Sequence, residues 1–192
     1  MTGKRQARKQ QMRRKQNQNR VIWGIIIVVV LGLVGFFVFS RPKAAVGEAV
    51  AVMPNTGHVP EGTDPGPYST DPPTSGPHYA GELDPGFYDE GSQQPQFPAG
   101  YLVHNLEHGY VIFWYNCSQL SDQDCSSLKS QIQSVLDREN KFKVIAYPWD
   151  SIDVPVVMTS WGRMQKFESF DPEEAAAFVE SNRNQAPEPN AP

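Results

Sequence analysis

Regular hydrophobic patterns in the second half of the chain predict strands and helices. Three stretches are crowded with β-branched and aromatic residues, as is typical of strands: "YLVH" (101–104), "GYVIFWYN" (109–116) and "KFKVIAYP" (141–148), the last stopped by Pro148. "PVVMTSW" (155–161) and "RMQKFES" (163–169) predict a hairpin that turns at Gly162.

Two other segments have the spacing and the caps of helices. In the segment 122–139, apolar residues recur at helical spacing after a cap at Ser121 or Asp122; they are Leu128, Ile132, Val135 and Leu136. In the segment 171–183, Asp171 is a cap, Pro172 occupies the first turn and acidic residues follow.

Residues 44–100 show no sustained period and are rich in Pro and Gly. Aromatic residues are nevertheless spread through them and need a surface on which to pack: Tyr68, Tyr79, Phe87, Tyr88 and Phe97. We expect a long ordered loop region with one short strand near 49–53. The sequence therefore predicts an α+β fold, in which two helices pack on a small mixed β-sheet under this loop region.

The stretch "VIWGIIIVVVLGLVGFFVF" (21–39) has no charge and no polar stripe. Its nineteen residues would form a helix of roughly 28 Å, close to the thickness of the hydrocarbon core of a bilayer. We predict a single transmembrane helix. A cleaved signal peptide is the alternative; its apolar region is normally shorter, and "AAVGEA" (44–49) is a poor cleavage site.

Charge is distributed unevenly around this apolar stretch. Eight basic residues and no acidic residue precede it, whereas seven basic and all 21 acidic residues follow Lys43, so that this larger part has a formal charge of −14. The positive-inside bias places the amino terminus in the cytoplasm and the acidic body outside the cell membrane. Attraction to anionic lipid explains the basic tail, and an acidic body argues against a nucleic-acid partner.

These observations divide the chain into five parts. They are a basic cytoplasmic tail (1–20), a transmembrane helix (21–40), a linker (41–48), an extracytoplasmic α+β domain (49–184) and a disordered tail (185–192).

The chain has two cysteines, Cys117 and Cys125, eight residues apart at a strand–helix junction. An even pair outside the cytoplasm at such a spacing predicts a disulfide. A thiolate metal site is the weaker alternative, since the sequence has no C-x-x-C pair.

All four histidines lie within residues 58–108. His104 and His108 can bind one ion if they share a helical turn, or if "NLE" is the loop of a hairpin that holds their Cβ atoms about 5 Å apart. In one straight strand they would be roughly 13 Å apart. Strand-like sequence on both sides favours the hairpin or a very short helical turn. His78 follows three prolines in "DPPTSGPHY" (71–79), a stiff loop that suits a pre-positioned ligand, and His58 has a similar Gly/Pro setting.

"HNLEH" (104–108) also matches the H-x-x-E-H pattern of a class of zinc proteases, in which the glutamate activates water. That motif requires a long helix, and here Gly109 and an apolar strand-like run follow at once. Separate loop histidines with local hydrogen bonds are the other alternative to a shared metal site.

"DPPTSGPHY" followed by "LVHNLEHGYVIFWY" resembles the signature of a bacterial family catalogued as domain of unknown function 3105, over roughly residues 48–183. The resemblance implies a membrane-anchored extracytoplasmic domain without an established activity. It implies that members keep the residues that stand here at His104, Glu107, His108, Gly109, Thr74, Ser75, Gly76 and His78, and His58 resembles a further family histidine.

These features predict an extracytoplasmic metal-binding module rather than an enzyme. We expect copper ahead of zinc, bound by His78, His104, His108 and His58, with Glu107, Ser75 and Thr74 supporting the ligands. Met53, Met158 and Met164 are possible soft ligands, although core packing explains them better. The alternatives are a metal-dependent hydrolase with Glu107 as general base, and a cell-surface domain that binds a protein partner and uses its histidines structurally.

Overall fold

A computed structural model of the chain describes residues 22–33 and 46–191. Contacts divide the chain into two compact units, residues 1–43 and residues 44–192. The first unit contains a helix over residues 22–33, whose large apolar side chains are exposed. The second unit contains the whole β-sheet and the three remaining helices of the described residues, together with all four histidines.

The second unit is built on one six-stranded mixed sheet with the order β1-β6-β5-β3-β4-β2. The strands are β1 (Glu48–Ala49), β2 (Gly86–Phe87), β3 (Val111–Tyr115), β4 (Val144–Pro148), β5 (Val156–Ser160) and β6 (Arg163–Phe167). β4 is parallel to both β3 and β2, and the remaining pairs are antiparallel. The predicted mixed sheet, the β4 strand and the hairpin at Gly162 are confirmed.

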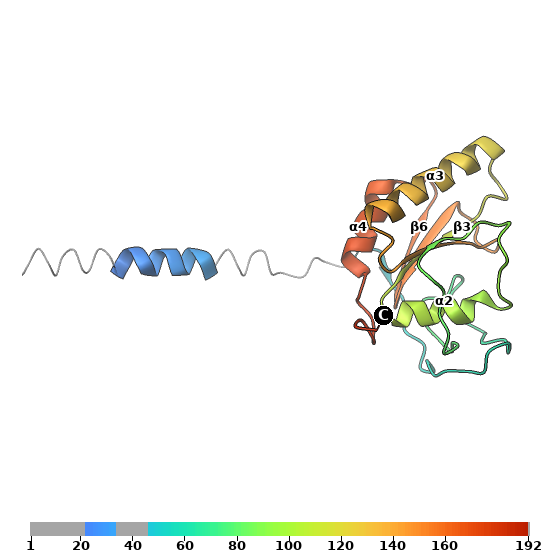
Figure 1. Ribbon diagram of the computed structural model, residues 1–192, viewed down its shortest axis with the longest axis horizontal. Coiled ribbons are helices and arrows are strands. Elements are labelled where there is room, and N and C mark those ends of the chain that lie inside the picture. The colour runs from blue at the N-terminus through green and yellow to red at the C-terminus, as the bar shows by residue number, and fades with distance from the viewer. Residues whose placement is uncertain (1–21, 34–45, 192) are drawn as a thin grey trace, which may run out of the picture. The chain divides into compact units, whose positions relative to one another are not determined.

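Helices cover both faces of the sheet, with one layer on each face (Figure 1). The helices are α2 (Pro98–Glu107), α3 (Asp122–Arg138) and α4 (Pro172–Asn182). One core cluster joins Val111, Phe113 and Tyr115 of β3 to the apolar sides of α3 and α4. The other joins Ile112 and Trp114 to Leu102 and Leu106 of α2. Successive residues of β3 therefore face opposite cores, as the two-residue period of a strand requires.

Helices α3 and α4 begin as the sequence predicts. The Ser121 side chain accepts a hydrogen bond from the Asp124 backbone, and the Asp171 side chain accepts from the backbones of Glu173 and Glu174. These bonds satisfy N–H groups that have no partner within the first turn of a helix.

The prediction of a strand at "YLVH" is wrong, because these residues belong to α2. Pro98 lies at its start and Gly109, with φ of +86°, follows its end, which is the usual placement of the two residues at helix boundaries. Leu102, Val103 and Leu106 are fully buried. Burial of these residues, with Leu102 and Leu106 packed against the sheet, outweighs the strand preference of a few β-branched and aromatic residues.

The segment after α4 also differs from the prediction of a disordered tail. The Asn184 backbone donates to the Gly109 carbonyl, and the Glu188 backbone donates to the Glu107 carbonyl. The ammonium of Lys143, which is buried, donates to the carbonyls of Pro189 and Ala191. Residues 184–191, which we call the C-terminal strap, thus lie against the end of α2.

Most of the Pro/Gly-rich region is ordered without regular structure, as predicted, with β2 its one named strand between residues 50 and 97. Its aromatic residues pack on the body: Phe87 stacks on Tyr115, and Tyr88 lies against Tyr147.

The predicted disulfide is confirmed. Cys117 and Cys125 are bonded with their Cα atoms 5.4 Å apart, which links the end of β3 to the first turn of α3.

The predicted transmembrane segment lies only partly within the described residues, which cover 22–33 of it. Across the part of the chain that the structure describes, no helix combines the length and the apolar character needed to cross a membrane. The basic tail (1–20) lies outside the described residues.

Candidate metal centre

Helix α2 presents two of the histidines on one side at its carboxyl end. His104 lies in the last turn and His108 is the residue that ends the helix, so the two are one turn apart. The Nε2 atoms of the two rings are 2.9 Å apart. The helical-turn alternative is therefore the correct one, and the hairpin is not formed.

The other two histidines come from neighbouring loop segments that pair through their backbones. His58 and His78 form an isolated parallel bridge, in which the Val59 N–H donates to the His78 carbonyl at 2.8 Å. This pairing brings the two rings to a centroid separation of 4.8 Å.

The loop before His78 depends on Gly76. Its φ is +137°, and a Cβ at this position would lie 2.8 Å from Tyr68 Cδ1 and 2.9 Å from Met53 Sδ. Only glycine meets both conditions without strain. The Met53 N–H also donates to the Ser75 hydroxyl at 3.0 Å, so the upstream segment is fixed on the same loop.

Tyr79 seats this loop on α2. Its N–H donates to the Gly100 carbonyl at 3.0 Å, and its buried ring lies so close to Gly100 that no Cβ fits there. The Tyr79 carbonyl in turn accepts from His104 Nδ1 at 2.5 Å. One residue therefore connects the two histidine-bearing segments.

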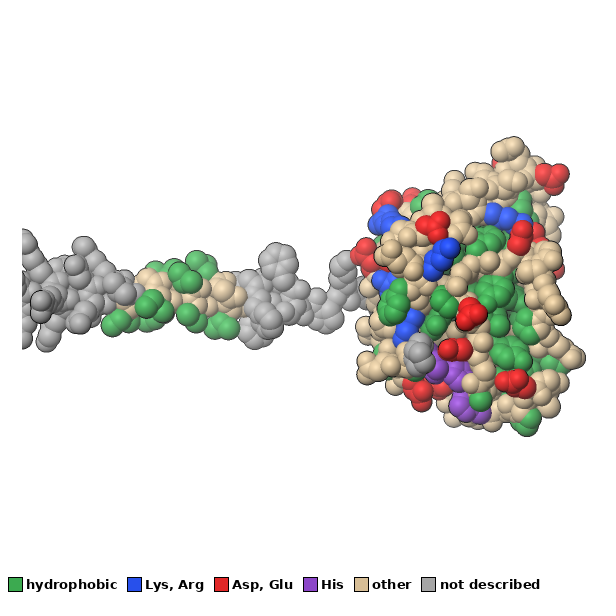
Figure 2. Space-filling model, in the orientation of Figure 1, with side chains coloured by type: hydrophobic (Ala, Val, Ile, Leu, Met, Phe, Trp, Pro, Cys, Tyr) green, Lys and Arg blue, Asp and Glu red, His purple; other side chains and the backbone are tan. Residues whose placement is uncertain are grey.

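The four rings form one cluster. The centroid of the His104 ring is 5.2 Å from that of His58, 5.2 Å from that of His78 and 4.3 Å from that of His108. His78, His104 and His108 are buried, whereas His58 is exposed. Figure 2 shows histidine side chains at the surface of this unit with acidic side chains around them.

The Nδ1 atoms of three rings are occupied by oxygen acceptors. His78 Nδ1 donates to the Gly76 carbonyl at 2.9 Å, and His104 Nδ1 donates to the Tyr79 carbonyl. His108 Nδ1 lies 3.0 Å from a carboxylate oxygen of Glu82. Because a carbonyl can only accept, His78 and His104 carry a proton on Nδ1, and their Nε2 atoms have a free lone pair when the ring is neutral.

Carboxylates surround the cluster. Glu107 Oε2 lies 3.0 Å from His78 Nε2, and Glu188 Oε2 of the C-terminal strap lies 3.6 Å from His108 Nε2. Burial lowers the pKa of His78, while the Gly76 carbonyl and the charge of Glu107 act in the opposite direction. The net effect favours the neutral ring, which is the form that binds metal ions.

Potential ligand atoms fall into two overlapping sets. One atom each from His58, His78 and His104 lie within 4.8 Å of one another, and so do atoms from Glu82, His104 and His108. We expected His78, His104 and His108 to surround one point with His58 as a fourth member. Within these sets, His104 is the common member, and His78 and His108 fall in different sets.

The supporting residues have different roles from those expected. Ser75 binds the Met53 backbone, and the Thr74 carbonyl accepts from the Gly162 N–H at 3.1 Å. Both are buried and fix the position of the loop. Met158 and Met164 belong to the two core clusters, as the packing explanation predicts, and Met53 lies against Gly76.

Sequence reasoning missed Glu82, Glu188 and Tyr79. Glu82 and Glu188 lie 26 and 80 positions from His108, in segments without a motif of their own. The "PHY" triplet (77–79) was a usable signal for Tyr79, because it places a large aromatic residue directly after a histidine in a stiff loop.

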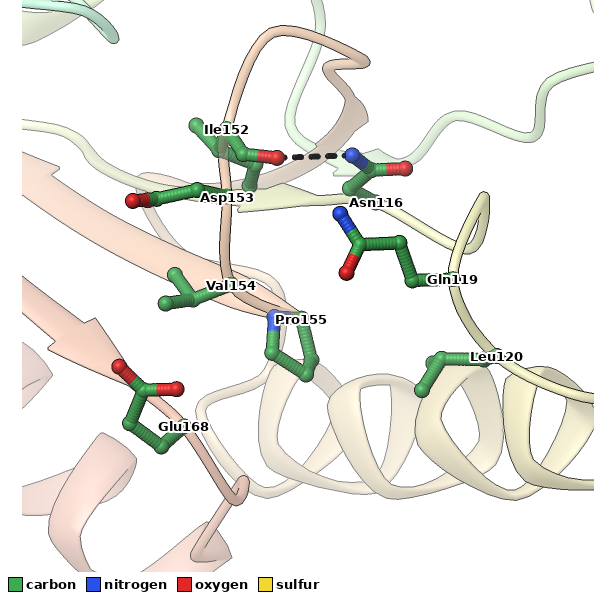
Figure 3. Close-up of a pocket in the computed structure, with 8 residues that line it drawn as sticks. All are labelled: Asn116, Gln119, Leu120, Ile152, Asp153, Val154, Pro155 and Glu168. Carbon is green, nitrogen blue, oxygen red and sulfur yellow. Dashed lines mark hydrogen bonds between the residues drawn. The ribbon is translucent and has the colours of Figure 1, made fainter.

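A separate cavity lies between the turn that follows β3 and the β4–β5 connection (Figure 3). It is lined by Asn116, Gln119, Leu120, Ile152, Asp153, Val154, Pro155 and Glu168. These residues include neither Glu107 nor any of the four histidines. This cavity is therefore not a substrate cleft for the histidine cluster.

Fold and site together define a small domain with helices on both faces of a mixed sheet and a histidine–carboxylate cluster between one helix and a proline-rich loop. The chain belongs to the family described as protein of unknown function (DUF3105), whose model matches residues 58–192. No curated protein and no solved structure matches the chain.

Proposed function

We propose that this protein is a metal-binding module whose ion is bound through Nε2 of His104, with its further imidazole ligands drawn from His58, His78 and His108. The single observation that carries the proposal is the 2.9 Å separation between Nε2 of His104 and Nε2 of His108. His104 Nδ1 holds its proton for the Tyr79 carbonyl, so Nε2 faces His108 with a lone pair.

A second contact has the same character. His78 Nε2 faces Glu107 Oε2 at 3.0 Å, while His78 Nδ1 is committed to the Gly76 carbonyl. A neutral His78 ring has no proton on Nε2, so this contact requires a proton on the carboxylate, a second proton on the ring, or a cation beside both atoms. A cation can serve this contact and the His104 Nε2 lone pair at once, and it avoids charging a buried ring, which is costly.

The outer hydrogen bonds also support metal binding. A ligating histidine commonly donates its other ring N–H to a backbone carbonyl or a carboxylate, and three of the four rings have such a partner here. Glu107 bonds to His78, which supports a role as ligand or partner of His78 rather than as the general base of a hydrolase.

Imidazole-rich sites suit both copper and zinc, and we place copper first. Divalent copper binds such donors more strongly than zinc does, and a location outside the cytoplasm exposes the site to an oxidising environment. The disulfide between Cys117 and Cys125 is consistent with that location.

We also propose that residues 21–40 anchor the protein in the cell membrane, with the amino terminus in the cytoplasm and the metal-binding unit outside. Support comes from the uncharged run 21–39 and from the basic residues before it.

Replacing His104 tests the metal site. In copper and zinc titrations of the full chain, purified in detergent without a histidine tag, we expect one ion per chain. We expect His104→Ala to weaken binding by about a hundredfold or more, since loss of even an outer partner of a ligand costs 10–100-fold.

Met158→Leu is the matched control, because Met158 is a buried core residue and should leave the affinity unchanged. Absence of stoichiometric metal in the wild-type protein, or equal affinities of wild type and His104→Ala, contradicts the proposed function.

A further inference from the structure

The two ligand sets cannot be occupied together. His104 is common to both, and its Nδ1 is bound to the Tyr79 carbonyl, which leaves Nε2 as its only free donor. One nitrogen lone pair binds one ion. The sets are therefore alternative positions for a single ion rather than two independent sites.

The two positions differ in charge. The first set is made of three imidazoles, two of them buried. The second contains the Glu82 carboxylate, whose side chain is 35 % exposed, and Glu188 lies 3.6 Å from the same His108 ring with 60 % of its side chain exposed. A hydrated cation in solution is attracted first to exposed carboxylates, while imidazoles bind copper or zinc more selectively.

The position of Glu188 is built into the fold. Its N–H donates at 3.0 Å to the carbonyl of Glu107, the residue that directly precedes His108. Lys143 Nζ donates to the His108 carbonyl and to two carbonyls of the C-terminal strap, those of Pro189 and Ala191. The strap is thus bound to the same turn that carries His108. These bonds hold the Glu188 carboxylate next to the His108 ring.

We propose that Glu82, Glu188 and His108 form a capture position, from which the ion passes through His104 to the imidazoles of His58 and His78. The inference rests on the proposed metal-binding function and adds a direction to it. His104 keeps its bond to the ion while the other ligands exchange, so the ion does not have to return to water during the transfer.

Rapid mixing of the full chain with Cu²⁺ tests this path. The binding rate is followed by quenching of the intrinsic fluorescence, and the ligands of the final complex by electron paramagnetic resonance. For Glu82→Gln/Glu188→Gln we expect an association rate about tenfold lower at low salt, with a weaker dependence on salt. The resonance spectrum of the bound Cu²⁺ should remain that of the wild type.

Two further variants complete the experiment. Glu173→Gln/Glu174→Gln removes two exposed carboxylates at the start of α4 and should leave the association rate unchanged, apart from a small general effect of charge. His58→Ala should have the opposite profile to the capture variant, with a near-normal association rate and faster dissociation, because His58 belongs to the final position alone.

The possible outcomes separate the two proposals. An unchanged association rate in the capture variant, or a changed resonance spectrum that makes a carboxylate a permanent ligand, overturns the capture path and leaves metal binding intact. A wild-type chain that binds no Cu²⁺ overturns both.

Discussion

At the scale of single residues, the chemistry of the site depends on ring nitrogens that already have hydrogen-bond partners. Three imidazoles give one nitrogen to a carbonyl or a carboxylate and keep the other for the cluster. This division of roles decides what each ring can bind, because a neutral imidazole has only one lone pair.

Gly76 is the residue whose replacement we expect to disturb the loop most. Gly76→Ala would force a side chain into a backbone with φ of +137° and into contact with Tyr68 and Met53. We expect a loss of about 1–3 kcal/mol in the free energy of unfolding, measured by urea denaturation, and weaker metal binding because His78 shifts.

Gly91→Ala is the matched control for this change. A Cβ at Gly91 would meet no atom within 4 Å, and we expect an effect within about 0.5 kcal/mol. Equal stability of Gly76→Ala and Gly91→Ala would show that the loop tolerates a side chain and does not hold His78 rigidly.

At the scale of elements, three segments far apart in the sequence meet at the end of α2. The proline-rich loop contacts the helix through Tyr79, both at Gly100 in its first turn and at His104 in its last turn, and the C-terminal strap contacts its end through Glu188. Gly109 makes the strap contact possible, since a Cβ there would lie 2.7 Å from the Asn184 Cα.

Lys143 is the residue that ties the strap down. Burial lowers the pKa of its ammonium, and three carbonyls from two segments accept its hydrogen bonds. We expect Lys143→Met to release residues 186–191. In hydrogen exchange the protection of the Glu188 amide should fall by about tenfold or more, in line with the loss of a hydrogen bond to a charged group.

Lys141→Met serves as the comparison, because the Lys141 ammonium is half-exposed and pairs only with Asp137 among the contacts described for it. In this variant the Glu188 amide should keep its wild-type protection from hydrogen exchange. If both variants retain that protection, the strap is held by its backbone bonds alone.

At the scale of the whole molecule, our proposal places the acidic unit and the basic tail on opposite sides of a membrane. Trypsin added to spheroplasts that express the full chain should digest residues beyond 43 and spare the basic residues before 21, since these lie inside. After permeabilisation the tail should be cut as well. If residues 44–192 survive external trypsin, yet are cut after permeabilisation, the proposed placement is reversed.

The sequence by itself determined much of the sheet and two of the helices. Strand β4, the hairpin at Gly162 and helices α3 and α4 follow from local period, turn residues and caps, which act within a few positions of one another. The disulfide also followed from the sequence, because only two cysteines are present at a short spacing.

Helix α2 and the full set of site residues were decided only by the tertiary structure. "YLVH" has a strand-like composition, and burial of Leu102 and Leu106 against the sheet made it helical. The sequence named the four histidines and Glu107, but it could not bring Glu82 and Glu188 to them, because those carboxylates arrive through the loop and the strap. Local patterns encode local structure, whereas a cluster assembled from distant segments depends on which surfaces the folded chain brings into contact.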